Sequence, residues 1–133
     1  MTSNIRHAEE LYAAFGRGDI PAVLAMCEPD LQWRQAEGHP YQPDGAVWTG
    51  PQTVLEKLFK RIGSEWDDFK VTLRAVHDAG DYVVAEGRYT GIYKPSSRSL
   101  DAQMCHILHF RSGKLSGFQQ YVDTAKLQAV MAS

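Results

Sequence analysis

Polar side chains recur near the C-terminal end of the chain, in two segments whose alternation is typical of neighbouring β-strands. Segments 102–110 and 115–123 are rich in β-branched and aromatic residues, and Ser112-Gly113 between them suits a tight turn. A two-residue turn pairs position 106 with 119 and position 104 with 121. The polar residues that this register places on one face are His106, Gln119, Tyr121 and Asp123.

These side chains suit acid/base chemistry on a carbonyl compound. Proton abstraction next to a carbonyl needs a base in an apolar pocket and a donor that holds the developing enolate. Asp123 is the candidate general acid/base, because an apolar neighbourhood raises the pKa of a carboxylic acid toward the operating pH. His106 is its candidate catalytic partner, and Tyr121 and Gln119 are candidate substrate contacts.

Each of these assignments has a structural alternative. Asp123 directly precedes a helical pattern that starts at Thr124, so its carboxylate is equally suited to capping that helix. His106 is equally well explained as a hydrogen-bonded histidine inside a sheet. A bulge in the hairpin would shift one strand by a residue and exchange His106 for Cys105 or Ile107.

Three residues outside the hairpin are further candidates for substrate binding. Trp33 belongs to a short predicted strand and is suited to lining a cavity. Tyr12 lies on the apolar stripe of the first predicted helix, where its hydroxyl either packs conventionally or points into the same cavity. His39 lies in a loop rich in glycine and proline, where it is either an ordinary solvated loop residue or a group at the mouth of a pocket. None of the histidines has metal-ligand spacing, so we expect no metal ion, and the absence of cofactor motifs predicts no cofactor.

Helices come first and strands last in the predicted order of elements. Helical patterns occupy 5–15, 20–27, 51–63 and 124–131, and strand patterns occupy 31–34, 69–77, 82–93, 102–110 and 115–123. Ser3 or Asn4 can cap the first helix and Asp19 the second. This order predicts the α+β class, with helices packed on one face of a curved antiparallel sheet that encloses a pocket.

Composition places the chain among ordinary globular proteins. Its 133 residues fit a single domain spanning 1–133, and 44% hydrophobic residues supply one core. A formal charge of -2 gives no general attraction to nucleic acid or to anionic membranes. Cys27 and Cys105 form no disulfide pattern, and the N-terminus carries no secretory signal pattern, so a cytoplasmic location is expected.

Several short segments resemble one family along nearly the whole chain. They are AAFGRGD at 13–19, LQW at 31–33, WTGP at 48–51, SGKL at 112–115 and YVDT at 121–124. They resemble the SnoaL-like, ketosteroid isomerase-related branch of the nuclear transport factor 2-like superfamily. The resemblance implies a cone-shaped α+β roll with an apolar pocket, dimerisation through the sheet, and a catalytic carboxylate corresponding to Asp123.

One departure from ketosteroid isomerase bears on the reaction. That enzyme carries its base on an early strand, where this chain has Trp33, Arg34 and Gln35. The difference disfavours steroid isomerisation and favours a cyclase-like arrangement.

Two functions therefore remain open. The first is a cofactor-independent enzyme of the isomerase, cyclase or lyase kind that performs acid/base chemistry on a small apolar carbonyl compound. The second is a non-catalytic ligand-binding or accessory domain. In either case we expect a homodimer. In this register the outward face of the hairpin is mixed enough either to face solvent in part or to meet a second subunit. Its residues are Ile107, His109, Phe118, Gln120 and Val122.

Overall fold

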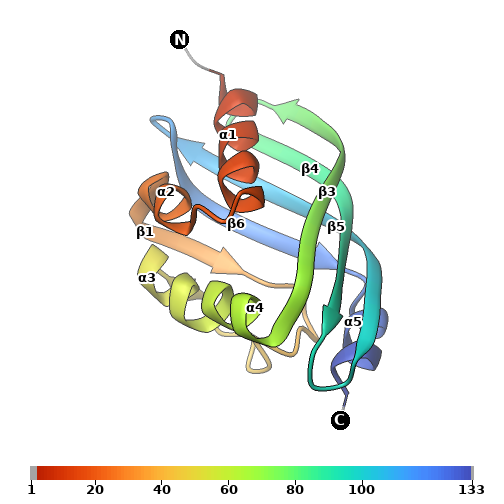
Figure 1. The fold of residues 1–133 in the computed structure, drawn as a ribbon. Helices are drawn as coiled ribbons and strands as arrows, with labels where there is room; N and C mark the ends of the chain where they lie inside the picture. Colours follow the sequence, from red (N-terminus) through yellow and green to blue (C-terminus); the bar gives the residue numbers. More distant parts are fainter. Residues whose placement is uncertain (1–2, 133) are drawn as a thin grey trace.

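A strongly curved sheet holds helices on its concave side in the computed structural model, which describes residues 3–132 (Figure 1). Its six strands lie in the order β2-β1-β6-β5-β4-β3. The strands are β1 (Cys27–Arg34), β2 (Trp48–Thr49), β3 (Trp66–Ala79), β4 (Tyr82–Tyr93), β5 (Arg98–Arg111) and β6 (Lys114–Val122). The helices are α1 (Asn4–Gly16), α2 (Ile20–Ala25), α3 (Pro51–Val54), η1 (Leu55–Phe59), α4 (Lys60–Glu65) and α5 (Thr124–Met131). The predicted α+β roll is confirmed.

Local capping signals define the two N-terminal helices. The Ser3 hydroxyl accepts a hydrogen bond from the Arg6 backbone N–H at the start of α1, and Asp19 does the same for Ala22 at the start of α2. Gly18 takes a positive φ of 75° after α1, a conformation that glycine adopts without steric cost. Both helices were predicted, although α2 ends at Ala25 rather than at position 27.

The third predicted helix contains a π-helical turn that the sequence did not predict. Segments α3, η1 and α4 follow one another without a break from Pro51 to Glu65. The π-helical turn carries Phe59, whose ring lies edge-on to Trp33 and tilted against Phe15. This helix therefore supplies one aromatic wall of the space above the sheet.

The strands follow the predicted order, with one correction to their direction. The strands β3, β4, β5 and β6 form an antiparallel meander as expected. The early strand β1, however, pairs in parallel with β6, so the sheet is mixed rather than purely antiparallel. A parallel pair needs a long connection between its two strands. Here the connection from β1 to β6 consists of the helical segments α3, η1 and α4 and the antiparallel strands that follow them.

Glycine and strand bulges bend the long β3–β4 pair. The register shifts between Leu73 and Ala75, opposite Gly87. A Cβ atom on Gly87 would clash with the backbone carbonyl oxygen of Thr72, so any side chain there would force the backbone apart. The bend is therefore built on a residue without a side chain, and it curls the sheet around the helices.

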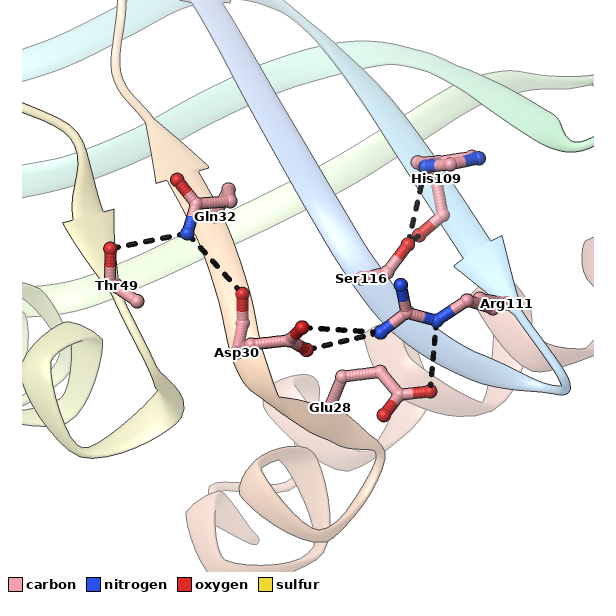
Figure 2. A network of polar contacts seen from close by, with 7 residues as sticks. All are labelled: Glu28, Asp30, Gln32, Thr49, His109, Arg111 and Ser116. Carbon is pink, nitrogen blue, oxygen red and sulfur yellow. Dashed lines mark hydrogen bonds and ion pairs between the residues drawn. The ribbon is translucent and has the colours of Figure 1, made fainter.

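A bulge also corrects the predicted register of β5 and β6. The pairs next to the turn are as expected, with Phe110 opposite Leu115, but His109 then pairs with Gly117. Ser116 is the extra residue, and its hydroxyl donates to the carbonyl oxygen of His109 at 3.1 Å (Figure 2). Beyond this point every pair is shifted by one, so the residue opposite His106 is Gln120 and not Gln119.

Ion pairs connect β5 to β1 across β6 near this bulge. Arg111, at the end of β5, lies 3.1 Å from a carboxylate oxygen of Asp30 and 3.7 Å from one of Glu28 (Figure 2). Such exposed pairs contribute little stability each, so the sheet depends mainly on its buried leucines, Leu31, Leu108 and Leu115.

Within residues 3–132, no helix has the length and hydropathy needed to cross a membrane.

Candidate functional site

A cavity of about 70 Å³ lies between the helices and the concave face of the sheet. By this measure a single water molecule needs roughly 10–15 Å³, so the space suits a small molecule. Most of its wall is apolar and aromatic, including Trp33, Phe59, Trp66 and Phe118. Besides the indole N–H groups, the polar side chains that line it are those of Tyr12, Gln35, His39, Tyr41, Tyr89, His106 and Gln120. No carboxylate is among the side chains of residues 3–132 that line it.

His106 lies in the cavity wall between two tyrosines. Its Nδ1 atom is 2.6 Å from the hydroxyl of Tyr12, which comes from α1. Its Nε2 atom makes a short hydrogen bond with the hydroxyl of Tyr89, which comes from β4. The ring of Phe118 packs against the imidazole with centroids 4.6 Å apart. These contacts fix the imidazole from both sides.

Burial keeps this group of three side chains neutral. His106 is 4% exposed, and burial lowers its pKa to about 3, so the imidazole carries one hydrogen at pH 7. Burial also raises the pKa of Tyr12 and of Tyr89. Both phenols therefore keep their hydrogens and can donate.

Gln120 fixes the direction of the hydrogen bonds in this group. Its Oε1 atom accepts from the Ala36 backbone N–H at 3.2 Å, so its NH₂ group faces Tyr89 and donates to the hydroxyl at 3.3 Å. A hydroxyl that already accepts one hydrogen bond is well placed to donate its own hydrogen, so the Tyr89 hydroxyl donates to His106 Nε2. The imidazole hydrogen then lies on Nδ1 and is donated to Tyr12. The hydroxyl hydrogen of Tyr12 has no acceptor among residues 3–132.

A second polar group lies in the loop that follows β1. The Trp33 indole N–H donates to Gln35 Oε1 at 2.9 Å, and the Tyr41 backbone N–H donates to His39 Nδ1 at 3.0 Å. Gln35 Nε2 and His39 Nε2 lie 3.2 Å apart. Burial, aided by the nearby charge of Arg61, lowers the pKa of His39 to about 4. His39 is therefore also neutral at pH 7.

Tyr41 joins the cavity wall to a carboxylate outside it. Its hydroxyl donates to Glu65 Oε1 at 2.9 Å and accepts from the Trp66 indole N–H at 3.0 Å. Arg61 pairs with the other oxygen of Glu65 at 3.0 Å and stacks over the Tyr41 ring. Both carboxylate oxygens of Glu65 are thus bound, one to Tyr41 and the other to Arg61. Within the described part of the chain, no three His, Cys, Asp or Glu side chains gather as a metal site would require.

Four of the seven predicted site residues come together in the cavity wall. They are Trp33, Tyr12, His39 and His106. Their roles in binding or catalysis remain predictions.

The other three, Gln119, Tyr121 and Asp123, lie outside the cavity because the bulge at Ser116 turns them outward. Tyr121 is 50% exposed. The Asp123 carboxylate caps α5 by accepting from the Lys126 backbone N–H at 3.2 Å, which is the structural alternative considered above.

The same bulge corrects the predicted outward face. Phe118 and Gln120 point into the cavity, whereas the sequence placed them on the outside. Tyr89 and Gln35 were not predicted as site residues at all. Tyr89 was detectable in principle, because it shares one face of β4 with the buried residues Val83 and Ala85.

Comparison with known proteins identifies the family. The model of the SnoaL-like domain matches residues 8–118. The chain belongs to the SnoaL-like family. A nuclear transport factor 2-like protein from Burkholderia thailandensis is 30% identical, with a TM-score of 0.92 and full coverage of both chains. A search of curated protein sequences finds no significant match.

Two less similar structures share the fold of this SnoaL-like protein. TerC, co-crystallised with polyporic acid, is 22% identical, has a TM-score of 0.84, and covers 98% of each chain. A putative SnoaL-like polyketide cyclase from Jannaschia sp. CCS1 is 17% identical, has a TM-score of 0.81, and covers 98% of this chain and 92% of its own. At these identities the likeness establishes the fold alone.

Proposed function

We propose that this SnoaL-like protein binds a small, largely apolar carbonyl compound in its cavity, with the carbonyl oxygen accepting a hydrogen bond from Tyr12. The observation that carries the proposal is the hydrogen count around His106. Tyr12, Tyr89 and the neutral imidazole hold three hydrogens, and their two mutual contacts use only two of them. The third is free for an oxygen atom in the cavity.

The rest of the wall supports an apolar body for this ligand. Trp33 stacks on Phe118 with centroids 3.8 Å apart, and Phe59 meets Trp33 edge-on, so flat aromatic surfaces border the free space. An apolar cavity with a small number of polar groups is typical of small-molecule sites, in which the polar groups set the orientation of the ligand. A flat molecule with one carbonyl fits this arrangement.

Catalysis would use the same hydrogen bond. A donor held at the oxygen stabilises the negative charge that develops there when a base takes a proton from the neighbouring carbon, which is the acid/base chemistry of an isomerase- or cyclase-like enzyme. No carboxylate among residues 3–132 lines the cavity, so the base that takes this proton would be hydroxide or a buffer base from solvent. The descriptions of two fold neighbours, one a putative polyketide cyclase and one crystallised with polyporic acid, agree with an oxygenated, largely cyclic substrate. Non-catalytic binding is the second candidate, favoured by the absence of carboxylates from the cavity lining within residues 3–132.

Ethylbenzene and acetophenone test the proposal, because they differ by one carbonyl oxygen. Acetophenone should bind more tightly by about 3- to 10-fold beyond any difference in hydrophobicity, the gain expected from one hydrogen bond. Tyr12→Phe should remove this preference. Tyr82→Phe, the same change at an exposed position on the outer face, should retain it. Dissociation constants from NMR titration give the comparison, and equal preference in wild type and Tyr12→Phe would refute the role of Tyr12.

The wild type and the Tyr12→Phe variant also distinguish an enzyme from a protein that only binds the ligand. An enzyme that stabilises the enolate should accelerate exchange of the acetophenone methyl hydrogens for deuterium in D₂O, and Tyr12→Phe should slow this exchange. Proton NMR follows the loss of the methyl signal. Exchange no faster than in buffer, with binding intact, would establish the non-catalytic candidate.

We also propose a homodimer formed through the outer face of the sheet. Tyr82, Ile92 and Tyr121 are large, exposed side chains on this face, from β4 and β6. Sedimentation should show a dimer, and Ile92→Asp should shift it to monomer by placing a charge in the contact. A wild-type monomer at high micromolar concentration would exclude this assembly.

A further inference from the structure

A buried series of hydrogen-bonding groups in the cavity wall contains more donors than acceptors. Its members, in order of contact, are the Trp33 indole, the Gln35 amide, the His39 imidazole and the Tyr41 backbone N–H. The groups at the two ends can only donate. The two groups between them, an amide and a neutral imidazole, each present one donor and one acceptor to their neighbours.

This arrangement cannot satisfy all three contacts. Gln35 turns its oxygen to Trp33 and so turns its NH₂ toward His39. His39 turns its lone pair to the Tyr41 N–H and so turns its own N–H toward Gln35. Two donors therefore face each other across 3.2 Å.

No alternative assignment removes the conflict. If the Gln35 amide is rotated, its NH₂ group faces the indole N–H of Trp33, so the conflict between two donors lies there. If the imidazole hydrogen is moved to Nδ1, it faces the backbone N–H of Tyr41, and the conflict lies at that contact. One contact is mismatched in every case. The mismatch is a property of the four residues and of their order.

We propose that the paired N–H groups of Gln35 and His39 form a binding site for a second acceptor oxygen of the ligand, a carbonyl or enolate oxygen. An oxygen that only accepts can receive both hydrogens and so resolves the conflict. This inference rests on the proposed function and narrows its substrate class. The substrate is an apolar molecule with two acceptor oxygens, one at Tyr12 and the other at Gln35 and His39.

The position of the pair supports a ligand site. Gln35 and His39 are 6% and 5% exposed, and both side chains line the cavity, so bulk water does not satisfy them. Gln120 connects the two polar groups, because it accepts from the backbone N–H of Ala36, next to Gln35, and donates to Tyr89. The two oxygen sites therefore lie along one connected polar strip of the wall. Since His39 is neutral at pH 7, the pair suits a carbonyl oxygen or a singly charged enolate rather than a strongly anionic group.

Three ligands test the inference with the chain of residues 1–133: acetophenone, 1,3-diacetylbenzene and 1,4-diacetylbenzene. The two isomers place a second carbonyl at different spacings from the first. At least one of them should bind about tenfold more tightly than acetophenone, the gain expected from a second buried hydrogen-bonding site. NMR titration measures each dissociation constant.

Two variants assign this gain to the proposed pair. In Gln35→Glu a carboxylate can accept from both Trp33 and His39, so the surplus donor disappears and the gain should fall to about twofold or less. Gln35→Met, which lacks donors and keeps a similar shape, should lose the gain as well and covers the case in which the glutamate variant does not fold.

The outcomes for the two proposals are distinct. If acetophenone is not preferred over ethylbenzene, the proposed function fails. If acetophenone is preferred but neither diacetylbenzene binds more tightly, or if the gain survives in both Gln35 variants, the second oxygen site is refuted and a structural water is left as the acceptor for these donors.

Discussion

Acidification from pH 7 to pH 4.5 is expected to remove on the order of 4–5 kcal/mol from the free energy of unfolding. The cause is the pair of buried, neutral histidines, His106 and His39. Their pKa values are lowered by burial to about 3 and about 4, whereas the unfolded chain has histidines of about 6.5. Below pH 6.5 the unfolded state binds these two protons and the folded state does not, so stability falls as the pH drops. Each histidine contributes about 1.4 kcal/mol per pH unit until its folded pKa is reached.

A carboxylate with a lowered pKa does not obscure this effect. The pKa of Asp101 is lowered by a hydrogen bond from Arg88, so this side chain remains ionised through the range in which the histidines titrate. Urea unfolding at a series of pH values between 7 and 4.5 measures the slope. His106→Gln, which retains a donor and an acceptor but does not titrate, should remove about half of it. An unchanged slope in this variant would show that His106 does not stay neutral in the folded protein.

The fold was largely predictable because its signals are local. Ser3, Asp19 and Asp123 each precede a helix and cap it with their side chains, and each capping position is visible as a residue type at a boundary. Alternation identified the four long strands for the same reason. The parallel pairing of β1 with β6 has no such signal, since it depends on how the chain returns to the sheet after some eighty residues.

The site was only partly predictable because a single bulge decides which hairpin residues face inward. Alternation counted from the turn predicts that Gln119 faces the cavity. Because Ser116 is an extra residue in β6, Gln120 takes the inward-facing position opposite His106 instead. The Ser116-Gly117 pair is compatible with a bulge but does not require one. His106 kept its inward position because the extra residue lies on β6, leaving the alternation of β5 intact.

The choice between capping and catalysis for Asp123 shows a related limit. Both roles need a carboxylate at the same point in the sequence, and only the direction of the last strand separates them. The structure turns Asp123 toward the Lys126 N–H and leaves the cavity chemistry to phenols, amides and imidazoles. Among the few polar groups of the cavity wall, hydrogen-bond donors thus outnumber the acceptors available to them. Residue types alone do not reveal this feature, because it depends on which polar groups contact one another.

Replacing His106 with leucine at pH 7 is expected to lower the free energy of unfolding by about 2–5 kcal/mol, measured by urea denaturation. Leucine fills much of the space but leaves the hydroxyls of Tyr12 and Tyr89 without the partner that holds them in a buried wall. An unpaired buried hydroxyl costs about 1–3 kcal/mol, and the lost packing on Phe118 adds to it.

Removing the two hydroxyls as well separates this polar cost from simple loss of packing. In the triple variant that combines His106→Leu with Tyr12→Phe and Tyr89→Phe, no hydroxyl is left without its partner, and only the NH₂ group of Gln120 loses an acceptor, so part of the lost stability should return. His106→Gln should lose much less than His106→Leu, since an amide can accept from one tyrosine and donate to the other. If the triple variant is no more stable than His106→Leu, the loss comes from packing alone. The hydrogen bonds of His106 would then contribute nothing to the fold, and holding Tyr12 in position for a ligand would be their remaining role.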